Sequence, residues 1–246
     1  MGVFAETGGN SCSKIHGDLI PLVDSPSLTG FWSGETTVVS VSGEHYFSQY
    51  PESALRTTPL QLTLRGHQVT LRSASGTFSP GSLDAGSAVL LKYAPQVPAK
   101  GTFLDIGCGW GPLAISLALE APDAAVVGVD VNDRALETAR ANAEHLGLTN
   151  THFSQPEEVD PALSFDLMWS NPPIRVGKAE LHQILATWLP RLSPKGQAWL
   201  VVAKHLGADS LITWLNSGDP GDFDAERVET SKGYRLIRVT KSLPLS

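Results

Sequence analysis

The segment Asn171-Pro172-Pro173-Ile174 has the residue types best suited to chemistry in this chain of 246 residues. An exocyclic amine on a purine is a poor nucleophile because its lone pair is delocalised into the ring. Two acceptors on its N–H bonds draw it toward tetrahedral geometry, and the Asn171 side-chain oxygen and the Pro172 carbonyl can supply them. The prolines restrict the backbone and so preorganise both acceptors. The segment predicts a site that orients an amino group, although Asn and Pro also favour simple turns.

A second chemical segment is the glycine-rich turn Asp105-Ile106-Gly107-Cys108-Gly109-Trp110-Gly111. Its glycines let the backbone turn tightly while a ligand approaches closely, and Pro112 suits the first turn of a following helix. Asp130 lies about 20 residues farther on, where a carboxylate can accept hydrogen bonds from ribose hydroxyls. The two features predict a site for an adenosine-containing ligand. Its expected residues are Asp105, Gly107, Gly109, Gly111, Asp130 and Asn171.

Each piece of this ligand site also has a simpler structural interpretation. Glycine-rich turns are common loops, and an aspartate after a strand often caps a helix. The glycine spacing departs from the dinucleotide fingerprint, which disfavours NAD. The ligand interpretation therefore depends on both pieces occurring together within a regular pattern of strands and helices.

That pattern begins near residue 101, where apolar strand-like runs and helical periodicity alternate. The predicted strands are 102–106, 125–129, 166–169, 197–202 and 234–239, and the predicted helices lie near 112–119, 134–146, 179–192 and 206–215. Such alternation specifies a doubly wound, Rossmann-like α/β sheet. Ligands bind at the carboxyl ends of the strands in such sheets, and both chemical segments lie at strand ends.

Three segments precede or open this sheet. Residues 1–43 mix Gly, Ser, Thr and Pro with short apolar pieces, which predicts a leader that is at least partly disordered. Residues 44–82 are predicted to be a small N-terminal β-hairpin extension, because apolar and polar residues alternate over 61–72 about Arg65-Gly66-His67. A helix over 83–93 then opens the main domain, residues 83–246.

Composition narrows the class of protein. The net charge of −7 argues against a protein that coats nucleic acid through a large basic surface, although it leaves a local basic patch open. No apolar run approaches the roughly 18 residues that span a bilayer, and the start lacks the pattern of a secretory signal. Cys12 and Cys108 have no paired zinc-ligand spacing. We expect a cytoplasmic protein with no metal and no membrane contact, and the sequence leaves its oligomeric state open.

The glycine turn resembles the first motif of the class I S-adenosylmethionine-dependent methyltransferases, acidic-x-Gly-x-Gly-x-Gly. The resemblance implies S-adenosylmethionine as cofactor, Asp130 as the ribose-binding acid and an antiparallel last strand. In that family a polar residue after the third strand contacts the adenine. Gln155 or Glu157 is the expected equivalent here.

Asn171-Pro172-Pro173 resembles the motif of methyltransferases acting on amino groups of adenine, guanine or glutamine, in which the fourth residue is usually aromatic. With Ile174, Lys178, Leu181 and His182, the segment looks like the branch that methylates guanine N2 in small-subunit ribosomal RNA. The resemblance to this branch covers most of residues 45–241. Besides the hairpin, the segments that carry it are His45-Tyr46-Phe47-Ser48, Phe78-Ser79, Leu83-Asp84-Ala85-Gly86-Ser87 and Lys232-Gly233-Tyr234-Arg235. The length resembles the single-domain form of this family.

The resemblance implies RNA as partner, either naked small-subunit ribosomal RNA or an assembled subunit, with Asn171, Pro172, Pro173 and Ile174 as catalytic residues. The aliphatic Ile174 and the negative charge leave adenine N6, a protein glutamine or a small molecule as alternatives, and a non-catalytic cofactor-binding or RNA-binding module is a third possibility. Some roles stay open. Phe78 and Leu83 either line the pocket or pack the hairpin onto the sheet; Asp84 and Arg175 either contact ligand or cap and face solvent; Trp110 and Trp169 are expected in the core or the pocket wall.

Overall fold

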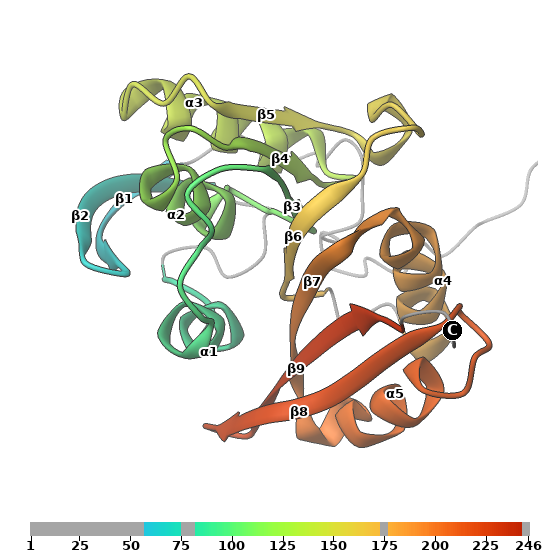
Figure 1. Cartoon of the computed structure of the whole chain (residues 1–246). Helices are drawn as coiled ribbons and strands as arrows, with labels where there is room; N and C mark the ends of the chain where they lie inside the picture. The colour runs from blue at the N-terminus through green and yellow to red at the C-terminus, as the bar shows by residue number, and fades with distance from the viewer. Residues whose placement is uncertain (1–56, 75–81, 173–176, 243–246) are drawn as a thin grey trace, which may run out of the picture. The chain divides into compact units, whose positions relative to one another are not determined.

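The glycine turn follows the strand Thr102–Ile106 and Asn171 follows the strand Phe165–Ser170, and these two strands are neighbours in the central sheet (Figure 1). In the computed structural model of the protein, residues 57–74, 82–172 and 177–242 are described. Their strands are β1 (Thr57–Leu64), β2 (His67–Ala74), β3 (Thr102–Ile106), β4 (Ala125–Val129), β5 (Thr151–Ser154), β6 (Phe165–Ser170), β7 (Leu192–Ala203), β8 (Phe223–Ser231) and β9 (Tyr234–Lys241). Their α-helices are α1 (Ala85–Tyr93), α2 (Pro112–Glu120), α3 (Asp133–His145), α4 (Lys178–Trp188) and α5 (Ala208–Leu215).

The seven-stranded sheet has the order β5-β4-β3-β6-β7-β9-β8, and its strands from β5 to β7 are parallel. The chain starts at β3, moves outward through β4 to β5, and then returns to β6 on the other side of β3. Loops leave β3 and β6 in opposite directions at such a switch point, which opens a crevice between them. Ile106 pairs with Ser170 at the ends of these strands, so the glycine turn and Asn171 start side by side.

The last strand, β9, is antiparallel to β7, as the family resemblance implied. It lies between β7 and the edge strand β8, which pairs with it antiparallel. The two edge strands, β5 and β8, were not predicted from the sequence. Strand β5 is only four residues long and buries only Phe153 and Ser154. In β8 only Phe223 and Ala225 are buried, and a register shift between Arg227 and Glu229 interrupts its alternation, so it lacks the apolar signal of a core strand.

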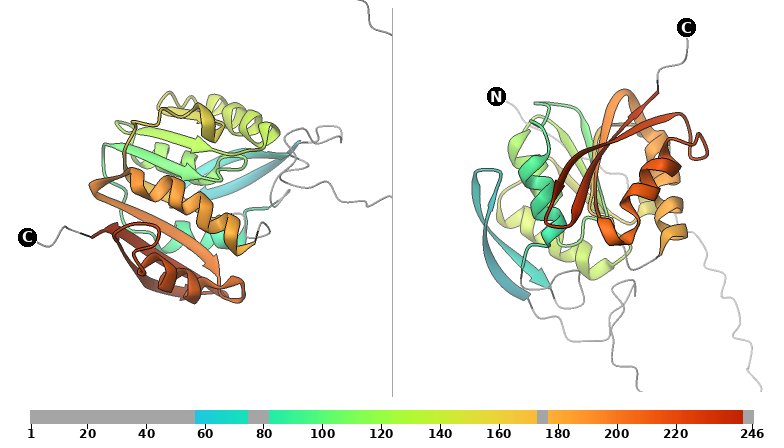
Figure 2. Two further views of the ribbon diagram at one scale, coloured as in Figure 1. Left: turned by 90° about the vertical axis from the view of Figure 1, so that its right-hand side faces the viewer. Right: turned by 90° about the horizontal axis from the view of Figure 1, so that it is seen from below.

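Alternate residues of each central strand face two different helical layers (Figure 2). Phe103 of β3 joins the core beneath α1, α2 and α3, whereas its neighbour Leu104 joins the core beneath α4 and α5. Both side chains are fully buried, as expected for parallel strands covered on both faces. The fold is therefore the doubly wound α/β sheet that the alternation predicted.

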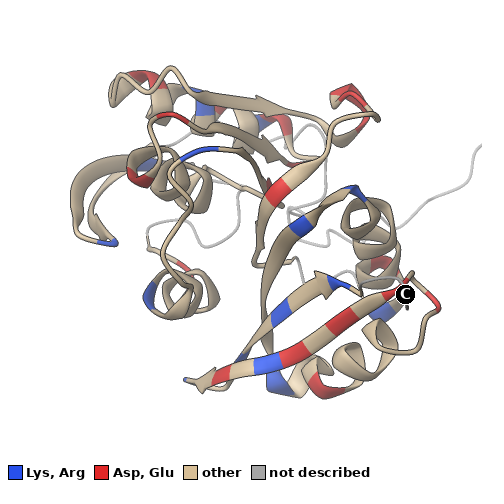
Figure 3. Ribbon diagram, viewed as in Figure 1, with Lys and Arg blue, Asp and Glu red and all other residues tan. Residues whose placement is uncertain are grey.

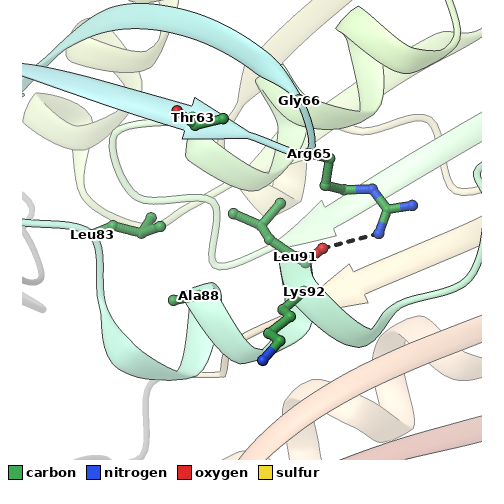
Figure 4. Close-up of a pocket in the computed structure, with 7 residues that line it drawn as sticks. All are labelled: Thr63, Arg65, Gly66, Leu83, Ala88, Leu91 and Lys92. Carbon is green, nitrogen blue, oxygen red and sulfur yellow. Dashed lines mark hydrogen bonds between the residues drawn. The ribbon is translucent and has the colours of Figure 1, made fainter.

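The predicted hairpin is present as β1 and β2, joined by Arg65 and Gly66, both with positive φ. The Arg65 guanidinium donates to the carbonyl of Leu91 at 3.0 Å (Figure 4). It also donates to the carbonyl of Ala94 at 2.9 Å and pairs with Glu120 of α2. A single side chain thus ties the hairpin turn to the carboxyl ends of two helices.

Asn142 of α3 forms a second tie to the hairpin. Its side-chain oxygen accepts from the Arg72 N–H at 2.8 Å, and its amide nitrogen donates to the carbonyls of Arg72 and Trp110, both at 2.9 Å. Trp110 belongs to the glycine turn. The extension is therefore integrated with the element that the ligand site uses.

Several element boundaries differ from the predicted ones for local reasons. The helix predicted near 206–215 begins at Ala208, because residues 204–206 form a 3-10 turn that ends at Gly207. The helix near 179–192 ends at Trp188 and continues as a 3-10 turn through Pro190, which cannot donate a helical hydrogen bond. Strand β7 begins at Leu192, five residues before the predicted start at Gln197.

Candidate active site

The glycine turn after β3 is held by backbone bonds to the neighbouring strand β4. The N–H groups of Gly107 and Cys108 both donate to the Val129 carbonyl, at 2.8 and 2.9 Å. All three motif glycines have positive φ: 73° at Gly107, 55° at Gly109 and 95° at Gly111. Residues with a Cβ rarely adopt this conformation, so the motif requires glycine for its own folding as well as for ligand approach.

Gly111 also brings two helices together. A Cβ at this position would lie 3.1 Å from the Ala139 Cβ of α3, and α2 begins at the next residue, Pro112. The first turn of α2 consequently packs closely on α3. A side chain at residue 111 would separate the two helices that support the glycine turn.

Asp105, at the penultimate position of β3, is fully buried. Its Oδ2 accepts from the Ala114 N–H of α2 at 2.9 Å, whereas its Oδ1 has no hydrogen-bond partner. Burial raises the pKa of this carboxyl from 3.8 to about 8; the Asp130 charge adds to the rise and the Ala114 bond opposes it. A buried acceptor without a partner is costly, so this atom is suited to a cationic group of a ligand. The ammonium group of S-adenosylmethionine has that character.

Asp130 follows β4 and is also buried. Its two oxygens accept from the N–H groups of Gly109 and Asn132, both at 2.9 Å. The capping role considered for Asp130 belongs instead to Asn132, whose side chain accepts from Ala135 at the start of α3. A carboxylate offers about four acceptor directions, so Asp130 can hold the glycine turn and still accept from ribose hydroxyls.

Asn171 lies at the carboxyl end of β6 and is half-buried. The preceding Ser170 is fully buried, and its hydroxyl donates to the Ile106 carbonyl at 2.8 Å, which joins the ends of β6 and β3. The Asn171 amide nitrogen donates to Asp84 Oδ1 at 2.6 Å and to Ser87 Oγ at 3.1 Å. With its nitrogen engaged in this way, the side chain keeps its oxygen as an acceptor for an incoming N–H group.

Pro172 is buried beside Asn171, but Pro173, Ile174 and Arg175 lie outside the described residues. Phe78 lies outside them as well. The structure therefore brings Asn171 and Pro172 to the same edge as Asp105, Asp130 and the three glycines, and leaves the other predicted catalytic residues as sequence predictions.

The start of α1 contributes residues that the sequence analysis did not assign to the site. Asp84 caps α1, and a Cβ on Gly86 would lie 2.8 Å from the Asn171 Oδ1 and 3.0 Å from the Tyr234 ring. Burial and the Asp84 charge raise the pKa of Tyr234. The resemblance pointed to the segments around Asp84 and Tyr234, but only the fold shows that they meet at Asn171.

The two candidates for the adenine contact differ in position. Gln155 follows β5 directly, is half-buried and donates to Asp133 Oδ1 at 2.6 Å. Glu157 lies in a 3-10 turn (Pro156–Glu158) and is exposed. Of the two, Gln155 is closer in sequence to the strand end where the ligand edge is formed.

Leu83 packs against the core under α1 and lines a groove of about 450 Å³ between that helix and the hairpin turn, with Thr63, Arg65 and Lys92 on its walls (Figure 4). This position favours the packing role over a place in the cofactor pocket. Trp110 and Trp169 are almost completely buried in the same core.

Within residues 57–74, 82–172 and 177–242 no helix is long and apolar enough to cross a bilayer. The same residues contain no cluster of three or more His, Cys, Asp or Glu side chains suited to a metal. Cys108 is a buried free thiol.

Comparison with known proteins gives related sequences along most of the chain. It is 36% identical over 202 residues to the uncharacterized protein YbxB of Bacillus subtilis, covering 80% of this chain and 98% of that one. It is 34% identical over 155 residues to the ribosomal RNA small subunit methyltransferase C of Vibrio parahaemolyticus, covering 61% of this chain and 45% of that one. The chain therefore spans nearly all of the first relative and less than half of the second.

A solved 16S rRNA N2 methyltransferase of T. thermophilus, in complex with AdoMet and guanosine, has the same fold. Its TM-score is 0.60 at 23% identity, over 78% of this chain and 52% of that one. The family model described as "Methyltransferase small domain" matches residues 68–234. The chain belongs to this family and is a class I methyltransferase with S-adenosylmethionine as its cofactor.

Proposed function

We propose that this enzyme methylates an exocyclic amino group, and specifically the N2 amine of a guanine in small-subunit ribosomal RNA. The observation that carries the proposal is the orientation of Asn171. Its amide nitrogen is engaged by Asp84 and Ser87, so its oxygen is the atom left to receive an N–H group beside the glycine turn.

The residues proposed to bind the cofactor follow β3 and its neighbour β4, or lie at the end of β3, where the order of the strands reverses. Asp105 Oδ1 would accept from the ammonium group of S-adenosylmethionine, and Asp130 would accept from its ribose hydroxyls. Gly107, Gly109 and Gly111 would let the backbone approach the ligand without side chains in the way. When bound, the cofactor supplies an electrophilic methyl group on a sulfonium.

The amine-binding residues act by alignment. Asn171 Oδ1 and the Pro172 carbonyl accept from the two N–H bonds of the target, so that the nitrogen lone pair points at the methyl group. Pro173 restricts Pro172, and Ile174 would give the base an apolar wall. The new N–C bond forms as the S–C bond breaks, and the methylated amine then loses a proton to water.

An RNA target is supported by the names of relatives, which include ribosomal RNA small subunit methyltransferase C and large subunit methyltransferase G. The charged residues of β9 are all basic, whereas those of the neighbouring strand β8 are acidic apart from Arg227 (Figure 3). Acidic side chains thus lie beside these basic ones, and RNA binding would depend on local contacts near the site. The base must be unpaired or flipped out to reach Asn171. Such a substrate supports a cytoplasmic location, which we propose for the enzyme. We also propose a leader at 1–43, a hairpin extension at 44–82 and a catalytic domain at 83–246.

A second candidate is methylation of another amine, either adenine N6, a protein glutamine or a small molecule. Ile174 favours it, because an aliphatic side chain does not stack on a base as an aromatic one does. A cofactor-binding or RNA-binding module without turnover fits less well, since Asp105, Asp130 and Asn171 are all present.

The test is to incubate the protein and radiolabelled S-adenosylmethionine with small ribosomal subunits, and with RNA extracted from them, prepared from a strain lacking the enzyme. Digestion should yield labelled N2-methylguanosine, and Asn171→Ala should slow the labelling by about 100-fold or more while the cofactor still binds. Label found instead in large subunits, in N6-methyladenosine or in protein would show that the enzyme has a different substrate from the one proposed. Turnover unchanged in Asn171→Ala would contradict the proposed chemistry.

A further inference from the structure

One carboxylate oxygen, Asp84 Oδ1, joins the start of α1 to the amine-binding residue. It accepts from the Gly86 N–H at 2.7 Å, from the Ser87 N–H at 3.2 Å and from the Asn171 amide nitrogen at 2.6 Å. The first two bonds cap a helix and are local. The third connects residues that are 87 positions apart in the sequence, so helix capping alone does not require it.

We propose that Asp84 is a positioning residue that sets which end of the Asn171 side-chain amide faces the substrate. This inference rests on the proposed function, in which the oxygen of that amide receives the target N–H. The two ends of an asparagine amide have nearly the same shape, so packing discriminates weakly between them. A carboxylate only accepts hydrogen bonds, and it therefore selects the orientation that places the nitrogen against Asp84.

The second partner of Asn171 does not discriminate in this way. The Ser87 hydroxyl accepts from the amide nitrogen at 3.1 Å, but a hydroxyl can rotate and donate to an oxygen in the same place. Of the two described partners, only Asp84 makes the reversed amide unfavourable. Ser87→Ala is therefore the matched control for the loss of one bond to Asn171.

The start of α1 also has room for this contact because residue 86 is glycine. A Cβ there would lie 2.8 Å from Asn171 Oδ1 and 3.0 Å from Asp84 Oδ1, so a side chain would push the pair apart. Gly86 thus leaves the space in which Asn171 approaches the helix, and Asp84 accepts the hydrogen bond that holds its amide in one orientation.

The experiment compares Asp84→Asn and Asp84→Ser in the full chain. Asp, Asn and Ser are comparable helix N-caps, so both variants keep the cap of α1. Asparagine keeps an acceptor of the same reach, whereas serine is too short to reach Asn171. We expect kcat to fall in the order wild type, Asp84→Asn, Asp84→Ser, with a loss of about 10- to 100-fold for serine, as removal of a charge-assisted bond implies. The KM for S-adenosylmethionine and the melting temperature should stay close to those of the wild type.

Two further measurements separate positioning from a general structural role. In the Asn171→Ala background, Asp84→Ser should cause no further loss, because its effect passes through Asn171. Ser87→Ala in the wild-type background should lower kcat by less than about threefold, as expected for a weaker neutral bond. Additive losses in the first comparison, or equal losses in Asp84→Ser and Ser87→Ala, would overturn the proposal.

A readout without turnover keeps this inference distinct from the proposed function. The side-chain amide protons of Asn171, assigned by their absence in Asn171→Ala, should show a downfield NMR shift from the carboxylate bond that Asp84→Ser removes. If no amine substrate is methylated, the proposed function fails and this shift still decides whether Asp84 holds Asn171. If the signal is the same in Asp84→Ser, the inference itself fails.

Discussion

The two halves of the proposed site, one for the cofactor and one for the amine, are built in different ways. The cofactor half consists of the glycine turn and Asp130, which are joined by bonds from Gly107, Cys108 and Gly109 to residues of the next strand end, about 20 positions away. The amine half depends on Asn171, whose described side-chain partners lie on a helix 84 and 87 residues earlier. The first half is a strand–turn–helix unit, whereas the second exists only when α1 has packed against the sheet. Changes in one half should therefore leave the other largely intact.

The largest effect should come from Asn171→Ala. Loss of one acceptor for the target amine removes alignment that is needed at the transition state, so kcat should fall by about 100-fold or more. Asn171 is also among the residues that the sequence predicts at the cofactor site, but the cofactor contacts proposed for Asp105 and Asp130 do not pass through its amide. The affinity for S-adenosylmethionine, measured by calorimetry, should therefore change little. A large loss of cofactor affinity would show that the two halves are not separate.

Two glycine substitutions should affect the two halves of the site separately, one lowering the affinity for the cofactor and the other lowering kcat. Gly111→Ala introduces a Cβ at a φ of 95° and 3.1 Å from Ala139, a strain of roughly 1–2 kcal/mol that should weaken cofactor binding about tenfold.

Gly86→Ala, its matched partner, introduces a Cβ 2.8 Å from Asn171 Oδ1 at a residue without positive φ. It should lower kcat about tenfold with normal cofactor affinity, because it displaces the amine-binding side chain. Binding and single-turnover rates measured on both variants test the pair. The reverse pattern, with Gly86→Ala weakening the cofactor, would contradict the assignment.

A change of pH should alter the binding of the cofactor and leave the amine half of the site unaffected. The Asp105 pKa of about 8 lies above its ordinary 3.8, so the folded, ligand-free protein gains stability from this carboxyl below about pH 4 and loses it progressively as the pH rises to 8. A cation beside Oδ1 favours the ionised form, so cofactor binding should release a proton. Affinity should rise by up to about tenfold per unit between about pH 6 and about pH 7.5, below the titration of the ligand's own amino group.

Asp105→Asn is the control for this pH dependence. It should lower affinity and make it nearly independent of pH across the same window, because the amide does not ionise. Calorimetry in buffers of different ionisation heat would count the released proton directly. No proton release in the wild type would mean that a cation does not pair with Asp105.

The smallest effect concerns the adenine end of the cofactor half. Gln155→Ala should weaken S-adenosylmethionine binding by about two- to fivefold, in the range of one neutral hydrogen bond, whereas Glu157→Ala should have no effect because its side chain is exposed. Titration of the two variants side by side measures this. Equal losses would place the adenine contact farther along the 3-10 turn.

Sequence periodicity predicted the parallel strands of the fold except the edge strand β5 (Thr151–Ser154), which has only four residues and buries only Phe153 and Ser154. The alternation of buried strands and helices from Thr102 to Val202 reflects burial on both faces, which leaves long apolar runs in the sequence. The edge strand β8 was missed because it buries only Phe223 and Ala225 and is interrupted by a register shift. It is recognised as a strand by its hydrogen-bonded pairing with β9 and not by an apolar pattern.

The sequence by itself determined the class of chemistry, methyl transfer from S-adenosylmethionine, and it predicted the residues for it: three glycines and two aspartates at fixed spacing for the cofactor, and Asn171 with its prolines for an amine. These signals are local, since each motif folds with its own strand end. Only the tertiary structure decided that the cap of α1 supports Asn171, that Asn132 rather than Asp130 caps α3, and that Asp105 Oδ1 lacks a partner. Such contacts join distant segments through packing, and no periodicity in the sequence records which distant side chains will meet.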